Sequence, residues 1–492
     1  MTSNKGSYRQ IFKATSLFGG VQVFNIIIGI IRSKIVAVLL GASGMGVLGL
    51  FTTTIAMVQS ITGLGLSSSA VRDISEASGS GNSQKIASSI KILRRWVWAT
   101  GLFGSVATVA LAPLLSKWTF GNEEYTWAFI WLSVTLLLNA LSSGQTSLLQ
   151  GMRRLKDMAK SSMLGSLVGL ITSIPLYYFF GIKGIVPALI VTAATALLLS
   201  SYFARRVSVA PVKQTWHESY KGGINMAKLG IAMMFSGFMV TLVSYVTNLF
   251  VSRTGGVSDV GMYRAAWTIS AQYVGLVFTA MATDYFPRLA GLNNDSKAQH
   301  QTVNQQSEIA LLILGPMLVT LIGFAPLLVR LLYTPEFLPI RTMICWNMIG
   351  IPFKAASWAL GFLVIAKGNS KLYFITETLA NAIMLLFNIL GYMWGGLAGL
   401  GFAFFASYAA YLAIMAAIAY RAYGFRFDRQ LIRIFVLQLA MVSATFAATF
   451  IVSTPISYAI IVIALIASTI YTLKEVNKRL NILEVVKKFR NK

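Results

Sequence analysis

The chain has 492 residues, of which 56% are hydrophobic and 11% are charged, and its formal net charge is +26. Because a soluble domain carries about 25% charged residues, this composition excludes a protein whose bulk faces water. The single cysteine, Cys345, excludes an intramolecular disulfide. The two histidines, His217 and His300, lie far apart along the chain, so we expect no metal site and no cofactor.

About 14 apolar segments follow one another along the chain, each long enough to cross a membrane as a helix. The first seven cover residues 16–40, 47–68, 96–115, 127–148, 163–180, 185–203 and 229–251. The second seven cover residues 262–283, 309–332, 343–366, 372–394, 397–420, 431–453 and 456–473. Since hydrocarbon offers backbone polar groups no partner except one another, we expect an all-α polytopic membrane protein with short loops.

The positions of the 41 lysine and arginine residues predict the orientation of these helices. Most of them fall on the two ends of the chain and on alternate loops, whereas the opposite loops carry only Lys117, Lys183, Arg253, Arg330 and Arg341. Cytoplasmic loops of membrane proteins are enriched in lysine and arginine. We therefore expect both termini in the cytoplasm and basic loops that contact anionic membrane lipids, not nucleic acid.

An internal repeat relates two parts of the chain at an offset of about 215 residues. The sequence Ala-Pro-Leu-Leu occurs at 112–115 and at 325–328, while Gly46 and Gly181 recur as Gly261 and Gly396. Chance similarity among apolar segments is the alternative. The repeat predicts two pseudo-symmetric six-helix lobes around a central cavity. The expected parts are an N-lobe at 1–204, a cytoplasmic linker at 205–228, a C-lobe at 229–420, and two additional helices with a basic tail at 421–492.

Polar residues recur at helical spacing inside several apolar segments, which puts them on one face of each predicted helix. A charged group in hydrocarbon costs about 2.5–3.5 kcal/mol, so these faces should line a protein interior or a wet cavity. The candidate substrate-binding residues are Gln22, Asn25, Arg32, Lys34, Arg264, Trp267, Gln272, Asn347 and Lys354. The candidates for coupling to an ion or a proton are Glu377 and Asp284.

Together these residues describe a cationic chamber suited to an anion such as a pyrophosphate, because guanidinium groups offer phosphate oxygens a planar fork of donors. The amide and indole side chains would suit sugar hydroxyls and ring faces. A structural interpretation stays open, in which Arg32 and Lys34 extend to the membrane surface and Lys354 pairs with Glu377. In the same interpretation, Asp284 is simply exposed at the end of its helix.

Local motifs carry a family resemblance. They are FGNEEY at 120–125, VGMY at 260–263, WNMIG at 346–350 and GFLVIAK at 361–367, followed by Tyr373 and Glu377. With these motifs the chain resembles, over about residues 12–420, the Wzx-type O-antigen and lipid III flippases. These proteins form part of the polysaccharide transporter branch of the multidrug/oligosaccharidyl-lipid/polysaccharide (MOP) exporter superfamily. Members of this subgroup commonly end after twelve spans, so the last two helices depart from its pattern.

The resemblance implies a flippase and not an enzyme. Its substrate would be an undecaprenyl-pyrophosphate-linked glycan, such as an O-antigen repeat unit for lipopolysaccharide biosynthesis. The protein would move it from the cytoplasmic to the periplasmic leaflet of a bacterial inner membrane, by alternating access coupled to an ion gradient. The cavity arginines and lysines would hold the pyrophosphate. Further candidate partners are a polysaccharide polymerase and a chain-length regulator.

Two other functions remain as alternatives. The first is a cation-coupled multidrug exporter of the same superfamily, and the positive charge of the predicted cavity argues against its cationic substrates. The second is a membrane polysaccharide polymerase or glycosyltransferase. Such an enzyme should have a large outer loop with paired carboxylates for acid–base chemistry, and the outer loops of this chain are short.

Overall fold

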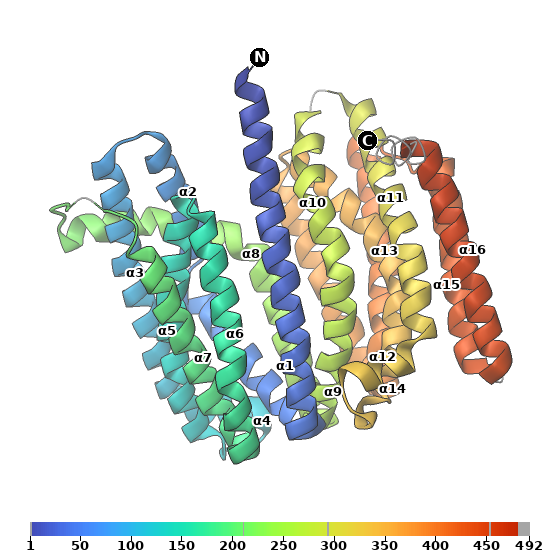
Figure 1. The fold of residues 1–492 in the computed structure, drawn as a ribbon, viewed down its shortest axis with the longest axis horizontal. Coiled ribbons are helices and arrows are strands. Elements are labelled where there is room, and N and C mark those ends of the chain that lie inside the picture. The colour runs from blue at the N-terminus through green and yellow to red at the C-terminus, as the bar shows by residue number, and fades with distance from the viewer. Residues whose placement is uncertain (1, 210, 293–294, 452–453, 481–492) are drawn as a thin grey trace, which may run out of the picture. The chain divides into compact units, whose positions relative to one another are not determined.

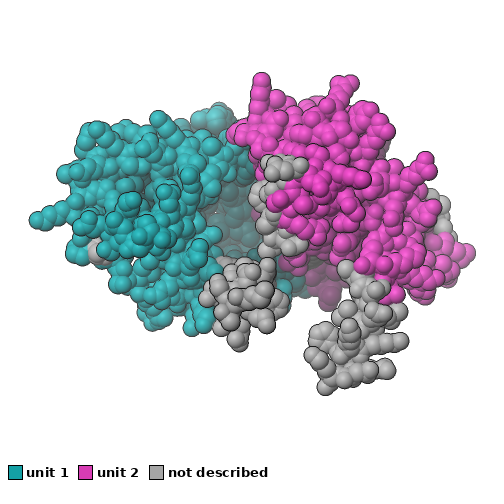
Figure 2. Space-filling view, turned by 90° about the horizontal axis from the view of Figure 1, so that it is seen from above, with its two compact units in different colours: residues 1–261 teal, residues 262–492 magenta. Residues whose placement is uncertain are grey.

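The computed structural model describes residues 2–209, 211–292, 295–451 and 454–480. These residues form helices and no strand, which confirms the predicted all-α fold (Figure 1). The chain divides into two compact units, Met1–Gly261 and Met262–Lys492, which Figure 2 colours separately. Each unit has its own buried hydrophobic cluster.

The first unit contains the helices of the N-terminal half. They are α1 (Thr2–Thr62), α2 (Leu66–Gly79), α3 (Ser83–Ala110), α4 (Ala112–Phe120), α5 (Thr126–Gly151), α6 (Leu155–Phe180), the 3-10 helix η1 (Gly181–Gly184), α7 (Ile185–Ala204) and α8 (Trp216–Thr254). The expected linker at 205–228 is helical in its second half, because a capping box starts α8 there. Thr215 Oγ1 accepts a hydrogen bond from the backbone N–H of Glu218, and the Glu218 carboxylate accepts one from the backbone N–H of Thr215.

The second unit begins within α9 (Val257–Thr268), which continues through the π-helix η2 (Ile269–Tyr273) into α10 (Val274–Gly291). The remaining helices are α11 (Ser296–Gly323), α12 (Ala325–Leu332), the 3-10 helix η3 (Pro335–Phe337), α13 (Ile340–Ala366), α14 (Ser370–Tyr423), α15 (Arg429–Ile451) and α16 (Thr454–Leu480). Pro352 lies inside α13.

Nine described helices are long and apolar enough to cross a membrane, or up to eleven if each of two bent pairs is one span. Three of the nine each cover all or most of two predicted segments, namely Gly20–Thr62, Leu155–Ala204 and Ser370–Tyr423. The two bent pairs contain the third and the eighth predicted segments. A multi-pass membrane protein is therefore confirmed, and the count of fourteen spans stays a prediction.

Glycines in a left-handed backbone conformation break the long helices between predicted segments. Gly41 interrupts α1 with φ 65° and ψ −168°. Gly181 follows α6 with φ 55° and ψ −134°, and Gly396 interrupts α14 with φ 54° and ψ −134°. Side chains other than hydrogen disfavour positive φ, so glycine is suited to each of these turns.

The same backbone breaks recur in the two halves of the chain. Gly181 and Gly396, whose dihedral angles agree within a degree, are related by the repeat found in the sequence. The bend before each Ala-Pro-Leu-Leu motif also recurs, at Leu111 (φ −96°, ψ 5°) and at Phe324 (φ −105°, ψ 15°). These shared conformations support a structural repeat and not a chance similarity of apolar sequence.

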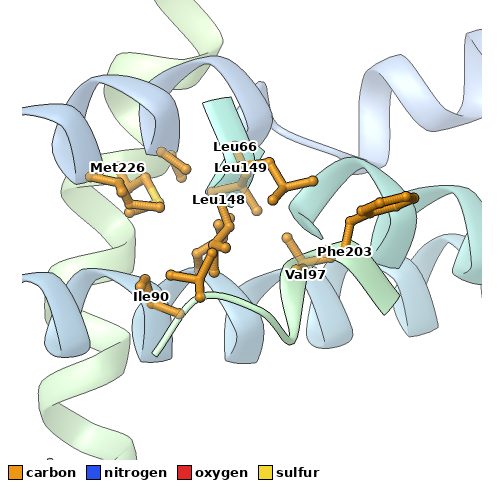
Figure 3. Packing of buried hydrophobic residues seen from close by; sticks show 13 residues of the cluster. Leu66, Ile90, Val97, Leu148, Leu149, Phe203 and Met226 are labelled. Atoms are coloured by element: carbon orange, nitrogen blue, oxygen red, sulfur yellow. The ribbon is translucent and has the colours of Figure 1, made fainter. Parts of the chain in front are cut away.

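Buried aliphatic and aromatic side chains hold each unit together. In the first unit, the cluster draws Leu66 from α2, Ile90 from α3, Leu148 from α5, Phe203 from α7 and Met226 from α8 (Figure 3). Side chains from five helices thus meet in one core. In the second unit, the corresponding cluster joins α10, α11, α13 and α14.

Polar contacts join α15 to α16, and α16 to α11, within the second unit. Ser468 Oγ donates to Gln438 Oε1 at 2.8 Å, and Gln438 Nε2 lies 3.1 Å from Thr472 Oγ1. Arg479 forms ion pairs of 2.7 Å with both Glu308 of α11 and Glu475 of α16. The two C-terminal helices, which have no counterpart in the repeat, are therefore packed against the body of this unit.

Candidate functional site

In the first unit, predicted site residues of α1 face α6. Asn25 Nδ2 donates to Ser162 Oγ at 3.0 Å, and Asn25 Oδ1 accepts a hydrogen bond from Ser166 Oγ at 2.8 Å. Two turns further along α1, Arg32 Nη2 donates to the Ser166 carbonyl at 3.3 Å. Asn25 and Arg32 thus lie on one face of α1, as their spacing predicted, and join it to α6.

The Arg32 guanidinium retains hydrogen-bonding capacity. Its Nε is buried and has no hydrogen-bond partner among the described groups. Gly169 of α6 makes room for the side chain, because a Cβ at that position would lie only 3.3 Å from Arg32 Nη2. The buried N–H of such an arginine can donate to an oxygen of an anion without first breaking a hydrogen bond within the protein. Of the other predicted residues in α1, Gln22 is exposed, whereas Lys34 is half-buried and has a partner.

The first unit also contains a cavity of about 280 Å³ at the end of α1, the start of α2 and the middle of α3, bordered by α5 and α8. Its polar lining includes Gln59, Ser67, Ser68, Thr100 and Ser143, and no charged side chain lines it. Amide and hydroxyl groups both donate and accept hydrogen bonds. This lining therefore suits a neutral molecule rich in hydroxyls. The helical spacing of polar residues in the sequence did not predict this cavity.

In the second unit, Lys354 lies near the middle of α13 among aromatic rings. Its Nζ is 5.5 Å from the ring centres of Phe278 and Tyr408 and 6.0 Å from that of Phe404. Phe278 comes from α10, and the other two rings come from α14. A cation within about 6 Å of a ring centre is attracted by the electron-rich ring face. We call these four side chains the lysine cage.

No described carboxylate forms an ion pair with Lys354 in the lysine cage. Lys354 and Glu377 are both described, and no ion pair joins them, so the bridge that would make Lys354 purely structural is not formed. Ring faces offset only part of the cost of desolvating an ammonium group. The site is therefore electrostatically suited to a negatively charged ligand.

Asn347 lies two turns from Lys354 and is fully buried. Its Nδ2 donates to Ser270 Oγ of the π-helix η2 at 2.9 Å, while its Oδ1 is buried without a described partner. Trp267 is half-buried, and its ring centre lies 6.0 Å from that of Phe404 in an edge-on arrangement. Trp267 thus borders the lysine cage, whereas Asn347, two turns away along α13, is held by the π-helix η2.

The remaining predicted residues are less closely associated. Arg264 and Glu377 are half-buried, and each has a partner. The backbone carbonyl of Glu377 accepts a hydrogen bond from Asn381 Nδ2 at 2.8 Å. The side chains of Gln272 and Asp284 lie outside the described residues. Within the described part of the chain, no group of three or more His, Cys, Asp or Glu residues is arranged to hold a metal ion.

The sequence did not predict the rings of the lysine cage, because polar residues defined the predicted faces and Trp267 was the one aromatic residue assigned to them. Phe404 and Tyr408 are four residues apart and therefore share a face of α14. That spacing is a usable signal, but aromatic pairs at this spacing most often pack in a core. Only the positions of α10 and α14 beside α13 show that the rings surround a lysine.

Comparisons with known proteins agree with this architecture. A family model described as "Polysaccharide biosynthesis protein" matches residues 35–342. The lipid III flippases of Escherichia coli (strain K12) and Shigella flexneri are each 20% identical over 365 residues, which is 73% of this chain and 86% of the relative.

Two solved structures show the same fold. The lipid II flippase MurJ in its inward closed conformation matches with a TM-score of 0.71 at 14% identity, covering 94% of this chain and 99% of MurJ. An inward-facing multidrug resistance MATE family transporter of the MOP superfamily matches with a TM-score of 0.65 at 14% identity, covering 84% of this chain and 96% of the transporter. The predicted resemblance to transporters, and not to enzymes, is confirmed. The chain has the fold of a MOP superfamily transporter and belongs to the polysaccharide biosynthesis protein family.

Proposed function

We propose that the chain is a flippase that moves an undecaprenyl-pyrophosphate-linked oligosaccharide, such as an O-antigen repeat unit, across a bacterial inner membrane. The relatives named as lipid III flippases support this substrate class. Transport runs from the cytoplasmic to the periplasmic leaflet, with both termini in the cytoplasm. The distribution of lysine and arginine between alternate loops supports that orientation.

The lysine cage is the observation that carries the proposal. A lysine in the middle of an apolar helix, surrounded by rings and without a described counter-charge, is costly unless a ligand supplies negative charge. A pyrophosphate supplies that charge, and the bordering indole of Trp267 suits the face of a sugar ring. Arg32, with its unused buried donor, is a second phosphate-binding group.

The oligosaccharide itself needs neutral, hydroxyl-rich surroundings. The uncharged cavity of the first unit has this chemistry, and its volume of about 280 Å³ suits a small part of a glycan. We assign the sugar to Gln22, Asn25, Gln272 and Asn347 together with this cavity. The cationic groups suit the pyrophosphate linkage, and the neutral polar groups suit the glycan. Together they favour a lipid-linked sugar over a lipid phosphate or a free sugar.

Movement of the substrate follows from alternating access of two lobes, N-lobe at 1–204 and C-lobe at 229–420. The repeated breaks at Gly181 and Gly396 support two lobes of similar architecture. We assign coupling to an ion or proton gradient to Glu377, with Asp284 as a second candidate, because a carboxylate can change its charge as its surroundings change. A polysaccharide polymerase and a chain-length regulator are the proposed protein partners.

Reconstituted transport tests the proposal. Proteoliposomes would receive labelled lipid-linked oligosaccharide, and its arrival in the opposite leaflet would be measured for wild type, Lys354→Ala and Lys354→Arg. We expect about a tenfold or greater loss for Lys354→Ala, since a charge-assisted hydrogen bond contributes about 1.5–3 kcal/mol, and partial activity for Lys354→Arg. Lys474→Ala, at an exposed position of α16, is the matched control. Unchanged transport in Lys354→Ala would remove the role assigned to the lysine cage.

A multidrug exporter of the MOP superfamily is the second candidate, favoured by the structural match to a MATE family transporter. Its cationic substrates would be repelled by Lys354, whereas an anionic lipid would be attracted. Export of a cationic dye by the same proteoliposomes, without movement of the lipid-linked oligosaccharide, would decide for the exporter.

A further inference from the structure

A groove of about 450 Å³ lies at the N-terminal ends of α5 and α7 in the first unit, and none of the predicted site residues lines it. Trp127 and Trp131 of α5, four residues apart, form one wall, and Pro187 and Ile190 of α7 lie on the other. Trp127 and Trp131 are 72% and 61% exposed, whereas tryptophan side chains are highly buried on average. The groove is therefore an open, largely apolar surface.

Positive charge lies at one end of this groove. Lys183 of η1 lines it and is exposed, and no ion pair among the described side chains includes it. The helix α7 begins here, and it has no acidic side chain in its first turn. Helix N-termini carry partial positive charge, which adds to that of the lysine.

The internal repeat shows what covers the equivalent surface in the other half. Gly181 and Gly396 are related by an offset of 215 residues. The same offset relates the last residue of α5, Gly151, to the last residue of α13, Ala366. It makes Trp346 of α13 the equivalent of Trp131 of α5. The ring of Trp346 lies 4.8 Å from that of Phe446, so α15 covers this side of α13. The first unit has no counterpart of α15 among its described helices.

The lysine distinguishes the two surfaces. The residue equivalent to Lys183 is Ala398, so the surface that α15 covers has no cation at this position. The uncovered surface keeps a cation at the junction of η1 and α7, where the predicted apolar segments end and a membrane surface is expected. Tryptophan and lysine are the residues that anchor proteins at this level of a bilayer.

We propose that this groove binds one anionic phospholipid, with its phosphate on Lys183 and an acyl chain along the two indoles and Ile190. The lipid takes the place that α15 occupies in the second half. It lies against the outside of the first unit, and it is a structural ligand and not the transported substrate.

Native mass spectrometry of the full-length protein tests this assignment. The protein would be titrated with phosphatidylglycerol and with phosphatidylcholine of the same acyl chains, and the dissociation constant of the first bound lipid would be compared. We expect wild type to prefer phosphatidylglycerol about tenfold, an amount that corresponds to one charge-assisted contact. Lys183→Ala should reduce this preference to about twofold or less, and Lys183→Arg should keep it. Lys117→Ala, which replaces an exposed lysine in the last turn of α4, is the control and should behave as wild type.

Trp131→Ala should weaken both lipids alike, because the indole contacts the acyl chain. A full preference for phosphatidylglycerol in Lys183→Ala would overturn the proposal. Displacement of the lipid by inorganic phosphate or by a soluble oligosaccharide, at concentrations that leave phosphatidylcholine binding unchanged, would also overturn it and identify the groove as a phosphate or glycan site.

Discussion

Replacing Lys354 with methionine should make the protein more stable and less active at the same time. Methionine has a similar length, is apolar, and makes favourable contacts with aromatic rings, so it can occupy the lysine cage without the charge. The two opposite effects follow because the charge is present in the cage without a described counter-charge.

The size of the stability change can be worked from the geometry of the cage. A lysine at the centre of a spanning helix costs about 2.5–3.5 kcal/mol. The three ring contacts, at 5.5, 6.0 and 5.5 Å, lie near the outer limit of a cation–π interaction, where each contributes about 0.5 kcal/mol. About 1–2 kcal/mol of unfavourable free energy remains, which Lys354→Met should recover as a gain in stability.

Steric trapping in bicelles measures the free energy of unfolding of membrane proteins and would give this difference directly. The same preparations, reconstituted in liposomes, would report transport, which we expect to fall about tenfold or more. Lys474→Met is the control and should change neither quantity. A Lys354→Met protein that is less stable than wild type would refute the reasoning, because the lysine charge would then stabilise the fold.

Three further predictions concern other parts of the chain. Gly46→Ala should destabilise the protein by about 1–3 kcal/mol, because the new Cβ would lie 1.9 Å from the Val257 carbonyl oxygen. The control Gly29→Ala, whose Cβ would have nothing within 4 Å, should be neutral or stabilising. Equal stabilities of the two variants would contradict the close packing of α1 against α9. Arg479→Met should cost about 3–5 kcal/mol in unfolding experiments, since it leaves the buried carboxylate of Glu308 unpaired, and the double variant with Glu308→Gln should recover most of the loss. Glu377→Gln should abolish any dependence of transport on a pH gradient, and a dependence equal to that of wild type would eliminate Glu377 as the coupling residue.

The helical architecture could be predicted from the sequence because hydrocarbon leaves the backbone few alternatives. Apolar segments must become helices, so their positions follow from composition. The helix breaks were also accessible, since Gly181 and Gly396 recur at the repeat offset and adopt the same left-handed conformation. The bend of 70° between α3 and α4 was not predicted, because the sequence shows one apolar segment at 96–115 and the bend depends on local backbone angles at Leu111.

The candidate site could be predicted only in part. The spacing of Asn25 and Arg32 placed both on one face of α1, and both contact Ser166 of α6. Periodicity within a helix does not say which neighbour that face meets, so the contact with α6 was not foreseen. The lysine cage was missed for the same reason, since its rings come from α10 and α14, far from Lys354 in the sequence.

The most direct test compares transport of two lipid-linked oligosaccharides that share the same glycan and prenyl chain. One carries the natural pyrophosphate linkage, and the other carries a neutral ether linkage. We predict that wild-type protein in proteoliposomes moves the pyrophosphate compound at least about tenfold faster, and that Lys354→Met removes most of this difference. Equal transport of both compounds by wild type, or a preference for the neutral one, would contradict the claim that a positively charged site within the membrane selects the substrate.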